Sequence, residues 1–206
     1  MNLAAVAGLP AIPVTSVWYR AIKPGHLANA LKYSHTHLFP SRYYEGPTAA
    51  TPFNIFYLAE NPLLAQLEVG AMFGSPSEPG GLIANPAGSW LILNAEVRLT
   101  RVADLTDVRG SHEALSTTAQ ELTGDWRGYR QRSAQTSVSS PCGVSPTQEL
   151  GAVLFSSGLF EGFLAISAKL PYQRILGIFP RNLSEAGFVR YRYEDAAGQM
   201  QIHEIP

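Results

Sequence analysis

FYLAENPLLAQLEV, residues 56–69, joins an extended segment to a helix. The aromatic and aliphatic residues from Phe53 to Leu58 predict a short strand. Asn61 and Pro62 then mark a helix start, because an Asn side chain caps free backbone N–H groups and Pro fits the first helical position. We therefore expect a strand that ends at Leu58, followed by a helix that reaches about Phe73.

Extended and helical patterns alternate on both sides of this segment. β-branched and aromatic residues predict strands, and Ser145 before Pro146 predicts a capped helix. Further strands are expected at 16–22, 89–99, 162–168, 174–179, 187–194 and 199–205, the last two joined by Ala196-Ala197-Gly198. Further helices are expected at 25–33, 107–122 and 146–156, with loops at 35–51 and 74–88.

The sequence predicts one domain over residues 1–206. We find no internal repeat and no linker long enough to divide the chain. The segment 123–145 is polar and rich in Arg, Ser and Thr, with Trp126 and Tyr129 as its large apolar residues. We expect it to be an insertion or a lid, and we expect residues 187–205 to form a C-terminal hairpin.

The composition indicates a packed globular protein that acts on a small ligand. Hydrophobic residues make up 46% of the 206 residues and charged residues 15%. This balance argues against disorder. The 15 Lys and Arg residues are matched by 16 Asp and Glu residues. The chain therefore lacks the overall positive charge that drives non-specific binding to nucleic acids or membranes.

The sequence predicts a cytoplasmic location, because it lacks a pair of cysteines, a basic leader and a long apolar run. Cys142 is the single cysteine, which excludes an intrachain disulfide and fits the reducing cytoplasm. The N-terminal segment has no basic residue before its apolar run and is interrupted by Pro10 and Pro13, so we interpret it as mature chain. No apolar run approaches the roughly 20 residues that span a bilayer.

Glu68 is the most unusual residue of the predicted helix at 62–73. Its neighbours one turn away are apolar: Leu64, Ala65, Ala71 and Met72. A carboxylate in an apolar stripe is costly to desolvate unless it is paired or serves a site. In the alternative reading Glu68 is exposed, on a helix whose buried face consists of Leu63, Leu67 and Gly70.

Arg20 interrupts the predicted strand VWYRAI. Alternation places it on the face of Trp18 and opposite Tyr19. A half-buried guanidinium needs a carboxylate or phosphate partner. The alternative is a solvent-exposed Arg at a strand edge.

The loop SHTHLFPSRYYEGP, residues 34–47, is rich in aromatic and basic residues. His35 and His37 have no further ligands at a metal-site spacing, so we expect no metal. Arg42, followed by Tyr43 and Tyr44, suits an anionic ligand that carries a ring. The alternative is an ordinary surface loop.

Ser167 ends the apolar strand GFLAIS. A hydroxyl at the rim of a sheet can reach a ligand cleft, although Ser is also a common strand terminator. No Gly-x-Ser-x-Gly elbow, Walker A motif or Gly-x-Gly-x-x-Gly run is present. A hydrolase triad, a phosphate loop and a Rossmann fold are therefore not supported.

Several segments together resemble the RES-domain family in order and spacing from about residue 17 to 183. They are Tyr19-Arg20, Ser41-Arg42-Tyr43, FYLAENPLLAQLEV, TQELGAVLFSSGLFEGFLAISA and ILGIFP. The family is named for an Arg, a Glu and a Ser. The resemblance implies that these are Arg20, Glu68 and Ser167 as catalytic residues, with Tyr19, Arg42 and Tyr57 binding substrate.

The resemblance also implies a fold and an activity. It implies an α+β fold with an ADP-ribosyltransferase-like split mixed sheet and peripheral helices. It implies cleavage of the nicotinamide N-glycosidic bond of NAD, by a glycohydrolase or phosphorylase, with NAD as substrate and without a cofactor. The implied setting is a cytoplasmic bacterial toxin paired with an Xre-type helix-turn-helix antitoxin, and a homo-oligomer stays open.

Three other readings stay open at this point. The chain could transfer ADP-ribose to a protein, or it could be a non-catalytic interaction module with this fold. A nuclease is suggested by toxin-like size and by Arg127, Arg130 and Arg132, but these arginines have no His and Glu beside them. We expect neither direct nucleic-acid binding nor membrane binding.

Overall fold

A computed structural model describes residues 1–76, 78–132, 139–141, 143–195 and 197–205. The chain has an α+β fold built on a mixed sheet of seven strands in the order β1-β2-β9-β8-β5-β10-β11. Only the pairing of β5 with β8 is parallel among these neighbours. The strands are β1 Ala11–Ile22, β2 Phe56–Ala59, β5 Leu91–Asp104, β8 Gly162–Ile166, β9 Arg174–Ile178, β10 Phe188–Glu194 and β11 Met200–Ile205.

The first five strands of this order close into a ring, because β1 pairs with β5 as well as with β2. β1 follows β5 along its whole length, with a register shift between Ile12 and Val14. Pro13 lies at this shift, where an irregular ladder tolerates a residue that has no N–H to donate. The strand therefore begins at Ala11, before the predicted residue 16.

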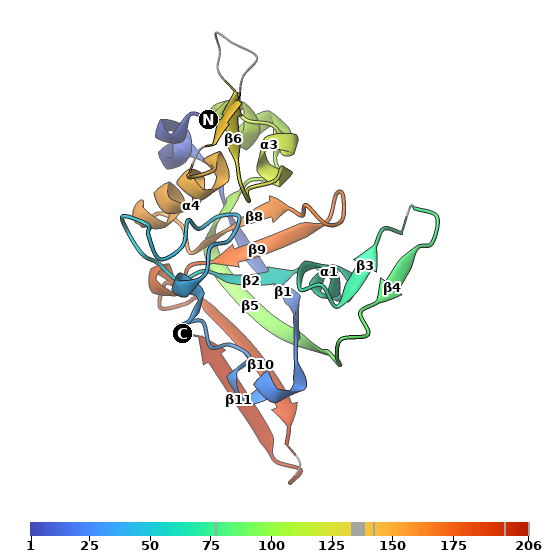
Figure 1. Cartoon of the computed structure of the whole chain (residues 1–206). Coiled ribbons are helices and arrows are strands. Elements are labelled where there is room, and N and C mark those ends of the chain that lie inside the picture. Colours follow the sequence, from blue (N-terminus) through green and yellow to red (C-terminus); the bar gives the residue numbers. More distant parts are fainter. Residues whose placement is uncertain (77, 133–138, 142, 196, 206) are drawn as a thin grey trace.

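Two hydrophobic clusters fill the two sides of the sheet. Alternation along β2 divides its side chains, since Phe56 and Leu58 belong to one cluster while Tyr57 and Ala59 join the other. The cluster that contains Ala59 also contains residues of the helices, and the cluster that contains Phe56 and Leu58 packs under the β10–β11 hairpin. Figure 1 shows α3 and α4 at one end of the molecule and the β10–β11 hairpin at the other.

Helix α4, Pro146–Ser156, matches its prediction. Ser145 and Gln148 form a capping box in which each side chain accepts a hydrogen bond from the other's backbone N–H, at 3.4 and 3.0 Å. The β10–β11 hairpin is also confirmed. Of its predicted turn, Ala196 lies outside the described residues.

The predicted helix at 62–73 is wrong in its length. Helix α1, Pro62–Glu68, starts as expected, with the Asn61 side chain accepting a hydrogen bond from Leu64 N at 2.9 Å. It stops at Glu68 because Gly70 follows with φ of +70°. The chain then forms a small hairpin of β3, Met72–Gly74, and β4, Leu82–Ala84, where a loop was expected.

The predicted helix at 107–122 is also wrong, since three shorter helices replace it. They are a π-helical turn η4, Val108–His112, then α2, Glu113–Leu115, and α3, Ala119–Thr123. The break follows from Ser116, which has φ of +50°, a conformation that no helix continues through. Thr118 then starts α3 as its cap, accepting a hydrogen bond from Glu121 N at 3.2 Å.

Smaller differences concern the remaining segments. Short 3-10 helices are η1 Leu3–Gly8, η2 Pro24–Asn29 in place of the helix at 25–33, η3 Thr36–Leu38 and η5 Pro180–Asn182. Within the predicted insertion, β6 Arg130–Arg132 pairs with β7 Ser139–Pro141. Residues 133–138 and 142 of that segment lie outside the described residues. Among the helices described, none is long and apolar enough to cross a membrane.

Candidate active site

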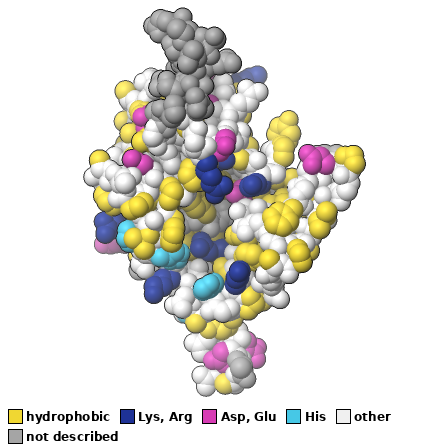
Figure 2. Space-filling model, in the orientation of Figure 1, with side chains coloured by type: hydrophobic (Ala, Val, Ile, Leu, Met, Phe, Trp, Pro, Cys, Tyr) yellow, Lys and Arg dark blue, Asp and Glu magenta, His cyan; other side chains and the backbone are white. Residues whose placement is uncertain are grey.

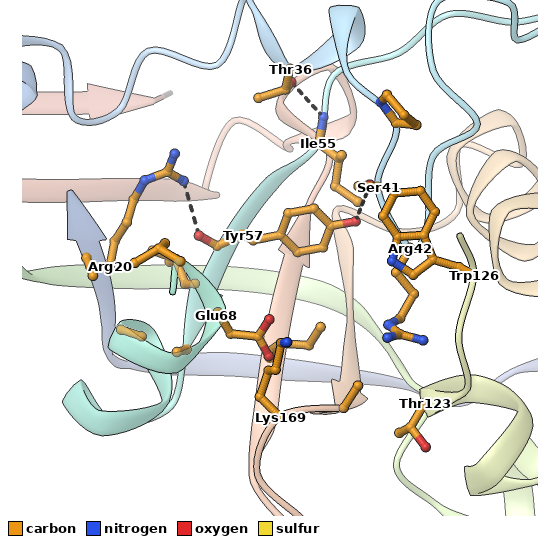
Figure 3. Close-up of a pocket in the computed structure, with 18 of the residues that line it drawn as sticks. Arg20, Thr36, Ser41, Arg42, Ile55, Tyr57, Glu68, Thr123, Trp126 and Lys169 are labelled. Atoms are coloured by element: carbon orange, nitrogen blue, oxygen red, sulfur yellow. Dashed lines mark hydrogen bonds between the residues drawn. The ribbon is translucent and has the colours of Figure 1, made fainter. Parts of the chain in front are cut away.

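A cleft of about 560 Å³ opens beside the ring of strands. Its walls come from β1, β2, α1, the loop before β2, the chain after α3 and the residues that follow β8. Tyr57 occupies the middle, with Arg20 on one side, and Arg42 and Trp126 on the other (Figure 3). Glu68 lies on a third side of the same space. The structure thus brings together five of the six predicted site residues, Tyr19 included, as cleft-lining side chains.

Glu68, the last residue of α1, is held by a residue distant in sequence. Its carboxylate accepts a hydrogen bond of 2.6 Å from the Ser167 hydroxyl. Ser167 follows β8, is only 3% exposed and also accepts a hydrogen bond from Lys169 N at 2.9 Å. Ser167 is not among the cleft-lining residues, so it lies behind Glu68 and orients its carboxylate.

The environment of Glu68 differs from the apolar stripe that we expected. Leu64 and Ala65 are buried, but Glu68 is exposed, and the end of α1 removes Ala71 and Met72 from its helical face. The carboxylate therefore faces an open cleft in the free protein. A ligand that fills the cleft would displace water from this carboxylate and so strengthen its electrostatic effect.

Arg20 projects from β1 and has no acidic partner. None of the ion pairs among the described residues includes Arg20. Its guanidinium donates to Tyr57 O at 3.1 Å and lies 4.1 Å from the centre of the Phe56 ring. Burial lowers the pKa of Arg20 to about 10, which still leaves it charged at neutral pH. A desolvated cation without a counter-ion is suited to binding an anionic ligand.

Tyr57 keeps its phenol proton. Burial raises the pKa of Tyr57, and this effect outweighs the hydrogen bond of 3.0 Å between its hydroxyl and Ser41 Oγ. Ser41 is held in turn by α4, because Gln148 donates to Ser41 O at 3.1 Å and to Tyr44 O at 3.2 Å. The phenol is thus a neutral, fixed group in the cleft.

Arg42 lines the cleft but is partly engaged by protein groups. It donates to Leu122 O at 3.4 Å and to Gly124 O, two carbonyls at the end of α3 that the helix leaves unpaired. Its neighbours Tyr43 and Tyr44 are fully buried and pack on Phe163 and Phe53, with ring centres 4.4 and 4.7 Å apart. These two tyrosines anchor the loop in the core and do not face a ligand.

The two histidines of this loop have different surroundings. His37 Nδ1 lies 3.2 Å from Asn54 Oδ1, and its carbonyl accepts a hydrogen bond from Tyr44. His35 is exposed and lies outside this cleft. In the described part of the chain, His, Cys, Asp and Glu side chains form no group of three that could hold a metal ion.

Sequence reasoning missed several cleft residues. Lys169 lines the cleft two positions after Ser167, and its place directly after a strand at the sheet rim was the available signal. Asp125, Trp126 and Arg127 also line it, although 123–145 was considered only as an insertion or lid. Trp126 supports the Arg127 guanidinium at 4.8 Å from the ring centre. This short segment after α3 therefore belongs to the wall of the site.

These groups define a class of site. An unpaired guanidinium, a neutral phenol and an oriented carboxylate share one cleft, so the site can bind an anionic ligand and stabilise positive charge that develops on it. The RES domain family model matches residues 17–197, and the chain belongs to the RES-domain family. The range matched by the family model includes the whole stretch, from about residue 17 to 183, over which the sequence resembles the family.

Among solved structures, the fold is similar to a chain of the M. tuberculosis MbcT–MbcA toxin–antitoxin complex. The TM-score is 0.59 at 16% sequence identity, over 98% of this chain and 89% of that chain. A comparison with curated proteins returns no match. At 16% identity, this structural similarity shows that the two chains share a fold.

Proposed function

We propose that the chain cleaves the bond between nicotinamide and ribose in NAD, which it binds as a substrate and not as a resident cofactor. The observation that carries the proposal is the Glu68 carboxylate, oriented by Ser167 in the same cleft as the unpaired Arg20 guanidinium. NAD has the complementary features, since its diphosphate is anionic and its nicotinamide ribose becomes positively charged as the bond breaks.

In the proposed reaction, the C–N glycosidic bond breaks and its electron pair stays on the nicotinamide nitrogen. Nicotinamide leaves as a neutral molecule, and positive charge moves onto the ribose as an oxocarbenium-like transition state. Glu68 stabilises this charge, as carboxylates do in glycosidases. Arg20 binds the diphosphate, with Arg42 as a second cation at the far side of Tyr57.

The remaining residues orient the substrate. Tyr19 and Tyr57 offer aromatic faces for stacking, and the Tyr57 hydroxyl offers a neutral hydrogen bond. Ser167 acts through Glu68, which we propose in place of the direct catalytic role that the resemblance implied for it. A water molecule, inorganic phosphate or a protein side chain then attacks the ribose, which corresponds to a glycohydrolase, a phosphorylase or an ADP-ribosyltransferase.

A single assay tests the proposal and identifies the acceptor. Purified protein is incubated with NAD, with and without phosphate, and the products are identified by mass spectrometry. We expect free nicotinamide together with ADP-ribose or phosphorylated ADP-ribose. A non-catalytic module would leave NAD intact, and a nuclease would cleave RNA instead.

The Glu68→Gln variant tests the site assignment. Glu68 is exposed, so the variant should fold, and we expect NAD cleavage to fall by about 10²–10³-fold. Glu149→Gln, an exposed carboxylate of α4 outside the cleft, is the matched control and should keep the wild-type rate. Equal rates for Glu68→Gln and wild type would refute the assignment.

We also propose a biological setting. The structural neighbour is described as part of a toxin–antitoxin complex, which supports a toxin held inactive by an antitoxin here as well. The proposed partner is an Xre-type helix-turn-helix protein, the proposed location is the cytoplasm, and the proposed core is of the ADP-ribosyltransferase type. Expression should deplete cellular NAD and stop growth. Joint expression with a cognate antitoxin of the proposed type should restore growth and yield a co-purifying complex.

A further inference from the structure

A second cleft, with a volume of about 780 Å³, adjoins the first. The end of β1, the helix η2, the residues that follow η2 and Trp90 before β5 form its walls. Arg20 and Ala21 line both clefts. Figure 2 shows dark blue and cyan side chains around the hollow in the middle of this face.

The second cleft is lined by cations. Arg20, Lys23 and Lys32 carry full positive charges, and His26 and His35 lie beside them. None of the described residues that line it is acidic. Partial desolvation lowers the pKa of His35, and the charges of Arg20, Lys32, His26 and His37 lower it further. The groups around His35 therefore produce a positive potential, which favours an anion.

Aromatic groups complete the lining. Phe39 lines the cleft beside the charged residues, and its side chain remains accessible, since the residue is 63% exposed. The indole N–H of Trp90 is buried and has no hydrogen-bond partner within the described structure. The Lys23 ammonium lies 5.7 Å from the centre of the Trp90 ring. A buried donor without a partner is costly, and a ligand acceptor in this cleft would satisfy it.

Arg20 stands at the junction of the two clefts. Among the described residues, the Arg20 guanidinium donates one hydrogen bond, to Tyr57 O, which leaves further N–H groups for a ligand. A diphosphate at this position would extend into both clefts. One end of an extended molecule could then contact Glu68 while the other end lies among the cations and rings of the second cleft.

We propose that the second cleft binds the adenosine-phosphate half of a dinucleotide, with the diphosphate on Arg20 and Lys32 and the adenine beside Trp90 and Phe39. This assignment rests on the proposed function, because it places the other half of the same substrate. It also explains why one side of Arg20 is lined by cations and aromatic rings without a carboxylate. The cation pair would fix the anionic centre, and the rings would select a base.

Binding is tested first, in the Glu68→Gln protein, so that the result does not depend on turnover. ADP, inorganic pyrophosphate and adenosine are titrated by calorimetry. We expect ADP to bind tightest, and Lys32→Ala, which removes an exposed side chain, to weaken it about tenfold. Trp90→Phe, which removes the indole N–H but keeps a ring, should also weaken ADP binding. Arg181→Ala removes an exposed cation outside both clefts and should leave it unchanged.

Kinetics then separates the two halves of the substrate. Lys32→Ala and Trp90→Ala should raise KM for NAD about tenfold and leave kcat nearly unchanged, because they weaken binding equally in the ground and transition states. Trp90→Ala should leave the cleavage of nicotinamide mononucleotide, which lacks the adenosine half, close to wild type. Lys32→Ala should raise KM for this substrate as well, because the mononucleotide keeps one of the two phosphates.

The two proposals can fail separately. ADP binding that depends on Lys32 and Trp90, without any NAD cleavage, would support the second cleft and refute the proposed activity. NAD cleavage with an unchanged KM in Lys32→Ala and Trp90→Ala would refute the second cleft alone. Pyrophosphate that binds as tightly as ADP would refute the role of the rings.

Discussion

Ser167 donates a hydrogen bond of 2.6 Å to the Glu68 carboxylate, although the two residues lie 99 positions apart in the chain. Ser167 is buried, whereas Glu68 is exposed in the cleft. The two residues therefore have different roles: Glu68 faces the cleft, and Ser167 holds the Glu68 carboxylate in one orientation. A residue that acts only through another can be recognised experimentally.

Ser167→Ala should lower kcat for NAD cleavage about 10- to 100-fold and change KM by less than about twofold, because the carboxylate loses its orientation while the cations that bind NAD remain. The free energy of unfolding of the variant should also fall by about 1 kcal/mol, since Lys169 N loses its hydrogen-bond acceptor. Steady-state kinetics and urea unfolding measure the two effects.

A double variant distinguishes positioning from a general structural role. In the Glu68→Gln background, Ser167→Ala should have no further effect on the residual rate, because the group that it orients is already gone. Losses that multiply in the double variant would show that Ser167 acts independently of Glu68.

Glu161 should make stability depend on pH. It is fully buried and accepts hydrogen bonds from Arg101 N at 2.8 Å and Ser184 N at 2.9 Å. Burial by itself raises the pKa of Glu161, but the hydrogen bonds from Ser184, Arg101 and Thr100 outweigh it and lower the pKa to about 2 from an ordinary value of 4.5. The charged carboxylate thus stabilises the fold above pH 4.5, and this contribution is lost as the pH falls toward 2.

Glu161→Gln should lower the free energy of unfolding by about 2–3 kcal/mol at neutral pH, since an amide group cannot accept all of these hydrogen bonds. Urea unfolding at about pH 7 and about pH 3 should show that the difference from wild type narrows in acid. Glu149→Gln is again the control. A difference that stays constant across this range would contradict the low pKa.

Gly151→Ala should lower the free energy of unfolding, although Ala usually stabilises a helix relative to Gly. A Cβ at Gly151, within α4, would lie 1.9 Å from Tyr43 O, so the helix and the loop at Ser41 and Arg42 would have to separate. We expect a loss of about 2 kcal/mol or more, whereas helix propensity alone would give a gain of about 1 kcal/mol.

Thermal unfolding and NAD cleavage measure this effect on the helix and on the site. Gly8→Ala, where an added Cβ meets nothing within 4 Å, is the control and should change neither. A Gly151→Ala protein with raised stability would show that α4 and the loop do not approach each other so closely.

Local signals in the sequence predicted much of the fold. Asn61-Pro62 and Ser145-Pro146 marked both helix starts, because caps act within one turn. The helix ends were less predictable. The break at Ser116 depends on a left-handed backbone conformation, which a Ser residue does not predict. The apolar pattern after Pro62 continues past Gly70, so the predicted helix was too long. Sheet order, set by contacts between distant residues, could not be derived from any local pattern.

The candidate site was predictable where a charged residue interrupted an apolar pattern. Arg20 and Glu68 were noticed for this reason, and both line the cleft. Their environments were not predictable, since Arg20 lies against Phe56 without a carboxylate and Glu68 is exposed. Lys23, Lys32 and Trp90 gave no such signal, because a cation or an aromatic residue at the end of a strand or in a loop fits an ordinary surface.

The strand order also sets the moment during synthesis at which the site is complete. Arg20, Tyr57 and Glu68 leave the ribosome early, but β2 lies between β1 and β9, and β9 begins only at Arg174. A nascent chain that ends before Ser167 lacks both the hydroxyl that orients Glu68 and the neighbour that fixes β2. We therefore expect premature termination anywhere before Ser167 to release inactive fragments, so that activity starts only after β8 and β9 have been synthesised.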